Sequence, residues 1–253
     1  MTATVSKLDG STSAASGSGT DFGGGVSLAY NAATGAYTVR DANGLTQSFA
    51  PSDITGSNAA ITAYNKTSGS VSDDLVLFNP GASNSRMALS YVSYGAWQRV
   101  TDNGATLDVT EQFFVYGIRQ AANQPSTGSG SYTTIVDGLW ANPNGVYSLA
   151  GTSSFTADFG AKTVATTIDL AGTNVVTNAP LAFGRFDGTG TIAALGGGFS
   201  GTFAQVGAAG DGNVYTGGFK GAFFGPAGQE VGYTFSLTAP GAAATGAVVG
   251  KAQ

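Results

Sequence analysis

Polar and apolar residues alternate along the first structured part of the chain. The runs Val26–Tyr30, Ala36–Arg40 and Leu45–Phe49 each alternate, and Asn31–Gly35 and Asp41–Gly44 separate them. Asn and Gly tolerate the positive φ angles of tight turns, so short alternating runs joined by such residues indicate neighbouring antiparallel strands. The pattern predicts a three-stranded β-meander.

Longer runs of the same kind follow at 73–79, 88–100 and 110–118. Together with the meander they predict a β-rich domain over residues 26–120. A proline among small polar residues then predicts a linker over 121–130. Residues 1–25 contain a long Gly/Ser/Thr stretch with little apolar material, which predicts a flexible segment.

Beyond the linker the rhythm becomes regular. Eight strands are expected, at 131–140, 145–158, 162–170, 181–186, 190–194 or 197–206, 213–224, 231–237 and 243–250. The turns expected between them lie at 142–145, 158–161, 187–188, 211–212 and 226–228. Short turns and the absence of helical periodicity predict an all-β fold in which residues 131–253 form an eight-stranded antiparallel barrel, closed to remove exposed edges and filled by side chains.

The amino-acid composition argues against most classes of enzyme. The 253 residues include no Cys and no His, and glutamate occurs only as Glu111 and Glu230. The common nucleophiles, general bases and metal ligands are therefore missing, and we expect a non-enzymatic protein without a metal site. Asp73–Asp74 is interpreted as a solvated strand entry, and the Asp102–Asp108 stretch near Glu111 as a hairpin turn at Asn103–Gly104, rather than as catalytic or calcium-binding carboxylates.

Charge and hydropathy bear on partners and location. Ten basic residues against fifteen acidic ones, scattered singly, leave no phosphate-binding patch, so nucleic acid is not expected as a partner. No run reaches the roughly 20 apolar residues of a membrane-spanning helix. Neither face of the strand expected at 152–157 is strongly apolar, which favours a soluble barrel over a membrane-embedded one. The chain starts without a signal-peptide pattern, yet its Gly/Ser/Thr/Asn-rich composition suggests a secreted or outer-membrane surface protein of bacterial type.

Several motifs resemble one family. The stretch GGFKGAFFGPAGQEVGYTF at 217–235 resembles a hairpin of transferrin-binding protein B barrels. Residues 131–140, 155–164, 198–201 and 247–251 resemble further strands of that barrel in the same order, and the region before it is similar to the family's β handle. The chain departs from the family in lacking a lipidated Cys, in carrying Tyr233 where a second Gly is usual, and in comprising one handle–barrel lobe.

The resemblance implies a function. It implies a non-catalytic bacterial binding protein that captures a host or environmental ligand, a small molecule or a protein, for outer-membrane uptake, with an outer-membrane transporter as a further partner. Because the chain is a single lobe, transferrin itself is not expected as the ligand. A structural or adhesive cell-surface module is the alternative.

Candidate site residues follow from the aromatic content and the hairpin motif. Tyr91, Tyr94, Trp97 and Tyr132 are candidates for stacking on a ligand, although alternating aromatics also fill cores. Some relatives implied by the resemblance capture haem, and without His the iron would need a Tyr or Met87 as its axial ligand.

In the hairpin motif, Gly225 is expected to adopt a positive φ, Pro226 to set the turn, and Glu230 to accept backbone donors. These are structural roles. Loops usually carry function on rigid β scaffolds, so the ligand is expected at the handle–barrel junction or at 50–72, 101–108 and 172–180.

Overall fold

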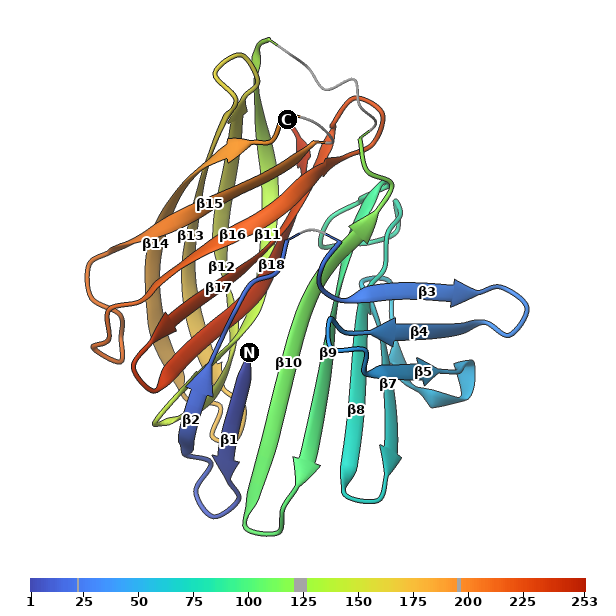
Figure 1. Cartoon of the computed structure of the whole chain (residues 1–253), viewed down its shortest axis with the longest axis vertical. Helices are drawn as coiled ribbons and strands as arrows, with labels where there is room; N and C mark the ends of the chain where they lie inside the picture. The colour runs from blue at the N-terminus through green and yellow to red at the C-terminus, as the bar shows by residue number, and fades with distance from the viewer. Residues whose placement is uncertain (22, 121–126, 195–196) are drawn as a thin grey trace.

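The computed structural model describes residues 1–21, 23–120, 127–194 and 197–253, and across these ranges the chain is almost entirely β-strand (Figure 1). The N-terminal half contains β1 (Thr2–Ser6), β2 (Thr12–Ser16), β3 (Ser27–Asn31), β4 (Ala36–Arg40), β5 (Thr46–Phe49), a 3₁₀ turn η1 (Pro51–Asp53), β6 (Ile54–Ser57), β7 (Ile61–Ser68), β8 (Val71–Phe78), β9 (Val92–Asp102) and β10 (Thr106–Gly117). The C-terminal half contains β11 (Ser129–Asn142), β12 (Gly145–Asp158), β13 (Thr163–Asn174), β14 (Pro180–Ile192), β15 (Gly198–Val206), β16 (Thr216–Phe224), β17 (Glu230–Ala239) and β18 (Ala242–Ala252). Within the described ranges no helix is long and apolar enough to cross a bilayer.

Two sheets form the handle. The larger has the strand order β2-β1-β10-β9-β8-β7-β6, and the predicted meander β3-β4-β5 is a separate sheet packed beside it (Figure 1). Val39 and Phe49 from the small sheet and Leu75, Trp97 and Phe114 from the large one are buried together in one core. The alternation seen in the sequence therefore supplies an apolar face to each of the two sheets.

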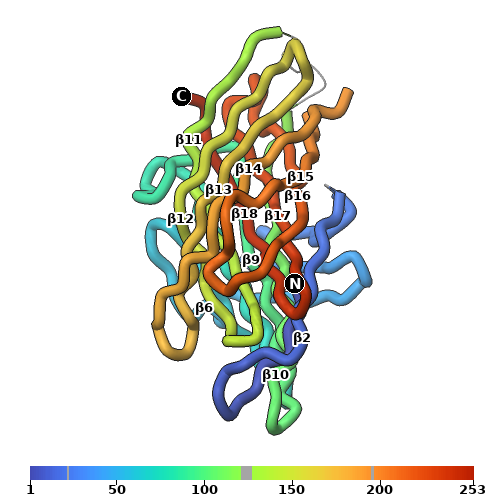
Figure 2. Tube along the Cα trace, turned by 90° about the vertical axis from the view of Figure 1, so that its left-hand side faces the viewer, coloured from blue at the N-terminus to red at the C-terminus, as the bar shows by residue number. Residues whose placement is uncertain are grey.

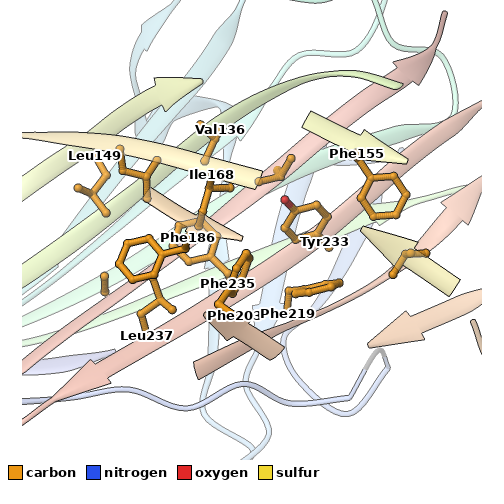
Figure 3. Close-up of a cluster of buried hydrophobic side chains, with 14 of the residues drawn as sticks. Val136, Leu149, Phe155, Ile168, Phe186, Phe203, Phe219, Tyr233, Phe235 and Leu237 are labelled. Atoms are coloured by element: carbon orange, nitrogen blue, oxygen red, sulfur yellow. The ribbon is translucent and has the colours of Figure 1, made fainter. Parts of the chain in front are cut away.

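The second half is a closed barrel in which β11 pairs with both β12 and β18, all antiparallel. The predicted all-β class and eight-stranded barrel are thus confirmed. Inward-facing aromatic side chains fill the interior, with Phe155, Phe186, Phe219 and Tyr233 among them (Figure 3). Tyr233, the departure from the family pattern, is fully buried and its hydroxyl lies 2.6 Å from that of Thr166.

One predicted turn is wrong. Asp187 and Gly188 lie in the middle of β14, whose strand continues to Ile192. A Cβ built on Gly188 would lie 2.8 Å from a ring carbon of Phe203 and 2.9 Å from one of Phe219. Glycine is needed here because the barrel interior is crowded. Asp-Gly pairs are common in turns, but this pair lies within an extended strand.

The N-terminal prediction also needs correction. Residues 1–25 were expected to be flexible, but β1 and β2 form a hairpin that extends the large handle sheet, with β1 paired to β10. Ala3 and Val5 are buried against Val109 of the handle and Val146 of the barrel. A short apolar alternation suffices here because a strand more than a hundred residues away supplies the backbone partners.

The large handle sheet lies along the outside of the barrel, where β10 contacts β17 and β18 (Figures 1 and 2). The junction buries an apolar cluster that includes Leu89 and Val92 of the handle and Phe224 and Val249 of the barrel. Handle and barrel are therefore joined through a core of their own.

Candidate functional site

The structure distributes the four candidate ligand residues over three cores. Trp97 is buried in the handle, where its indole N–H donates to Asp73 at 2.9 Å. Tyr132 is buried in the barrel and donates to the carbonyl oxygen of Gly228 at 2.7 Å. Tyr94 and the partly buried Tyr91 belong to the junction. The four side chains do not line a common pocket, and a ligand role for them stays a prediction.

Tyr94 takes part in a polar link between handle and barrel. Its hydroxyl donates to the Asp137 carboxylate on β11, and Arg86 lies 2.8 Å from the same carboxylate. Burial, followed by the Asp137 charge, raises the pKa of Tyr94 far above its ordinary value. Burial likewise raises the pKa of Tyr132 to about 12.

Ligation of haem iron by tyrosine requires a phenolate, which both of these environments disfavour. Met87 is buried in the junction core, at 7% exposure. Tyr94, Tyr132 and Met87 thus have structural roles, and the structure does not support haem as a ligand of these residues.

Glu230 joins the barrel to the handle more directly. Its two carboxylate oxygens accept backbone N–H groups of Ser90, Tyr91 and Val92 at 2.7, 2.7 and 2.9 Å. The turn before it contains Gly225 at φ +80°, and Pro226 is exposed within that turn. The backbone donors expected for Glu230 are present, and they come from the handle, at the point where β9 begins.

The other carboxylates named by the sequence have structural partners. The expectation that Asp73 lies at a solvated strand entry is wrong, because Asp73 is 3% exposed within β8, where Trp97 and Arg99 donate to its carboxylate. Asp73 forms an ion pair with Arg99 at 2.7 Å, Asp74 accepts from Asn65 at 2.8 Å, and Asp108 accepts from Thr4 at 2.8 Å. Across the described ranges, no group of three or more Asp or Glu side chains is arranged to hold a metal ion.

A surface common to handle and barrel lies at the lower end of the molecule in Figure 1, where several turns meet. We call it the turn surface, and it comprises the turns at 7–11, 69–70, 103–105, 143–144 and 175–179. The β1–β2 turn is its centre. Lys7 donates its backbone N–H to Ala105 at 3.0 Å, and its ammonium lies 2.9 Å from the Asp102 carboxylate. The backbone N–H of Asp102 in turn donates to Ser70 at 2.8 Å.

The same hairpin contacts the barrel. Thr12 donates its hydroxyl to the carbonyl oxygen of Asn142 at 2.5 Å and its backbone N–H to that of Pro143 at 3.4 Å. Gly10 lies beside the β13–β14 turn, where a Cβ built on it would be in van der Waals contact with Val176 Cγ2, at 3.5 Å. The β1–β2 hairpin thus connects handle turns and barrel turns into one continuous surface.

The turn surface combines exposed aliphatic side chains with charge. Leu8 is 93% exposed, Val176 66% and Val175 54%. The Lys7 ammonium, followed by the backbone N–H of Gly104, holds the pKa of the nearby Asp102 carboxyl below its ordinary value. Single exposed apolar residues are common, but three on adjoining turns beside a charged pair resemble the apolar centre and polar rim of a protein interface.

The turn surface includes parts of the three segments that were expected from the sequence to carry the ligand site. The segments 101–108 and 172–180 contribute the β9–β10 and β13–β14 turns. The segment 50–72 is mostly η1, β6 and β7, and only its end at 69–70 contributes. The central turn at 7–11 was missed because residues 1–25 were expected to be flexible. The sequence signal that could have indicated this turn was the apolar Leu8 between the charged residues Lys7 and Asp9.

Comparison with known proteins agrees with this architecture. The family model described as the C-lobe and N-lobe β-barrels of Tf-binding protein B matches residues 95–252. No curated protein sequence matches the chain.

Solved structures of transferrin-binding protein B are similar in fold. A double mutant from Haemophilus parasuis is 18% identical with a TM-score of 0.55, and the match covers 100% of this chain and 44% of that one. Intact Ap-TbpB, with N and C lobes, is 16% identical with a TM-score of 0.53, covering 100% and 45%. Isotype 1 from serogroup B Neisseria meningitidis is 18% identical with a TM-score of 0.50, covering 83% and 38%. The chain spans less than half the length of these relatives.

Proposed function

Since the chain belongs to the transferrin-binding protein B family, we propose that it is a surface-exposed lobe that captures a protein ligand through its turn surface. Proteins of this family are non-enzymatic ligand-binding lipoproteins of the outer-membrane surface. The observation that carries the proposal is the meeting of handle turns and barrel turns around the exposed side chains of Leu8 and Val176.

The geometry supports a protein ligand over a small molecule. A small-molecule site is concave and encloses most of its ligand, whereas the turn surface projects side chains from five turns. Protein interfaces draw most of their affinity from a few residues, and these lie in an apolar centre surrounded by a polar rim. The exposed side chains of Leu8, Val175 and Val176 form such an apolar centre, and the ion pair between Lys7 and Asp102 supplies a polar rim.

The family supports the remaining parts of the proposal. We place the chain on the bacterial surface and assign it to the capture step of an outer-membrane uptake system, with a transporter as the next partner. Transferrin is the ligand for which the similar solved structures are named, and it is therefore one probe of the test.

The test uses the immobilised chain and vertebrate serum, with purified iron-loaded transferrin in a separate arm. We expect the chain to retain a serum protein, and Leu8→Ser combined with Val176→Ser to reduce retention at least tenfold, because truncating interface anchors costs more than about 1.4 kcal/mol. Ile118→Ser is the matched control, since Ile118 is also 66% exposed but lies outside the turn surface.

Two results would contradict the proposal. One is a chain that retains no serum protein in either arm. The other is retention that the double variant and the control reduce equally. Retention of cell-surface polymers in place of protein would favour the adhesive module.

A further inference from the structure

The small handle sheet has an unpaired edge. Its strand order is β3-β4-β5, so within the described part of the chain β3 pairs with β4 on one side and with no strand on the other. Ser27, Ala29, Tyr30 and Asn31 are exposed along this edge. An open edge presents unpaired backbone N–H and C=O groups, which is a template for a further strand.

The edge lacks the usual protection against such pairing. Proteins blunt open edges with lysine, proline or a bulge. The β3 sequence Ser-Leu-Ala-Tyr-Asn carries no charge and no proline, and its register with β4 runs without a shift from Ser27 to Asn31. A regular, uncharged edge can accept a partner strand along its whole length.

The β3 sequence is complementary to itself. If two copies pair antiparallel with a twofold axis at Ala29, Leu28 of one copy lies opposite Tyr30 of the other. Ser27 then lies opposite Asn31, and Ala29 opposite its own equivalent. Aromatic–aliphatic pairs and polar pairs stabilise adjacent strands, and no like charges meet across this axis.

The exposed side chain of Tyr30 would be covered by the second copy in such a pair. Its side chain is 58% exposed, with its ring centroid 4.8 Å from that of Tyr37. Leu28 lines a cavity of about 250 Å³ together with Phe114 and Tyr116. Because Leu28 and Tyr30 share a face of β3, Tyr30 of the second copy would lie against Leu28 at this cavity. Each copy would thus cover the exposed tyrosine of the other.

We propose that the chain forms a twofold homodimer in which two β3 strands pair antiparallel about Ala29, joining the two small sheets into one six-stranded sheet. This pairing uses the side of the handle, away from the turn surface, and it does not depend on the proposed function. The interface is a short edge, which corresponds to a reversible dimer rather than an obligate one.

Sedimentation velocity over a concentration series tests the proposal. We expect the mass of the intact chain to rise from 25.1 kDa toward twice that value as concentration increases. Ala29→Lys should shift the dissociation constant upward at least tenfold, because it places two ammonium groups side by side at the axis. Ala33→Lys, in the exposed β3–β4 turn, is the matched control and should dimerise like the wild type.

Cross-linking gives an independent readout, since the natural chain has no cysteine. Directly opposite residues of antiparallel strands have Cα atoms about 4.5–5.5 Å apart, within reach of a disulfide. Ala29→Cys should therefore form a covalent dimer on mild oxidation, and Ala33→Cys should not. A wild type that stays monomeric throughout the series, a dimer unaffected by Ala29→Lys, or equal cross-linking of the two cysteine variants would overturn the proposal.

Discussion

The carboxylate of Glu230 receives three consecutive backbone N–H groups from Ser90, Tyr91 and Val92 while it is only 5% exposed. Buried backbone donors are costly to leave without an acceptor. One side chain at the start of a barrel strand thereby fixes the start of a handle strand. The hairpin motif that contains Glu230 therefore stabilises the handle as well as the barrel.

We predict that Glu230→Gln lowers the free energy of unfolding by about 1–3 kcal/mol, because an amide offers one acceptor oxygen and turns an NH₂ group toward backbone donors. Urea denaturation measures the change. Asp158→Asn is the matched control, since the exposed Asp158 carboxylate accepts one backbone N–H, from Ala161. The control should change stability by less than about 0.5 kcal/mol. Equal effects of the two substitutions would contradict the role given to Glu230.

Glu111 shows a different consequence of burial. It is 3% exposed on β10, and desolvation raises its pKa from 4.5 to about 7. The Gln98 amide and the Met1 ammonium oppose this shift, and the Asp74 carboxylate adds to it. Between pH 4.5 and about 7 the folded protein holds a proton that the unfolded chain has lost, so stability falls as pH rises through that window.

We predict that Glu111→Gln removes this fall, worth roughly 3 kcal/mol in the wild type, because it keeps a neutral side chain in place of the buried carboxyl. Urea unfolding at intervals from pH 4.5 to 8 would measure it. The variant should gain stability over the wild type toward pH 8 and match it near pH 4.5. Parallel curves for the two proteins would mean that the pKa of Glu111 is not raised.

At the scale of elements, the β1–β2 hairpin is the piece on which the turn surface depends. It is short, and its stability comes from pairing with β10 and from burial of Ala3 and Val5. Isolated two-stranded hairpins are marginal in water. The hairpin is therefore expected to be ordered only while its apolar face is covered.

We predict that Val5→Asp detaches the hairpin, because an aspartate would be buried among apolar side chains. Hydrogen exchange should then show loss of amide protection over 2–16, with protection retained in β13. Ser13→Asp, at an exposed position of β2, should leave the hairpin protected. Unchanged protection in Val5→Asp would show that the hairpin does not depend on this burial.

Elements with local signals could be predicted from the sequence. The meander, most of the barrel strands and the turn at 226–228 follow from alternation and from Gly, Pro or Asn at the turns. The turn expected at Asp187–Gly188 was wrong, because the sequence alone does not distinguish a glycine required by close packing from a glycine required by a turn. The β1–β2 hairpin was missed because its partner strand lies about a hundred residues away in the sequence.

Less of the turn surface than of the fold could be predicted from the sequence. Two of its turns lie in 101–108 and 172–180, which were expected to be loops. Their junction through Lys7, Gly10 and Thr12 depends on how the handle lies against the barrel, which no local pattern encodes. The same holds for Glu230, whose need for backbone donors could be inferred but whose donors lie 138–140 positions earlier.

At the scale of the whole molecule, the sequence predicts a handle over 26–120 and a barrel over 131–253, while the contacts of the structure cross that division. The junction core, the Glu230 contacts and the Arg86–Asp137 ion pair all join the two parts, and the N-terminal hairpin lies against both. Domains with a small polar interface unfold separately, whereas a shared apolar core favours one cooperative transition.

We therefore predict that handle and barrel unfold together, and the chain carries one tryptophan in each for testing it. Trp97 is buried in the handle core and Trp140 in the barrel core, and these are the two tryptophans of the sequence. Trp140→Phe leaves a fluorescence probe of the handle, and Trp97→Phe leaves one of the barrel. Within each variant, the tryptophan signal and the far-UV circular dichroism signal should give the same urea midpoint, because a two-state transition reports equally through every probe. Adding Glu230→Gln should lower both midpoints together. A handle probe that melts before the bulk of the β-structure would show that the junction core does not couple the two parts, and that the turn surface is not held rigid between them.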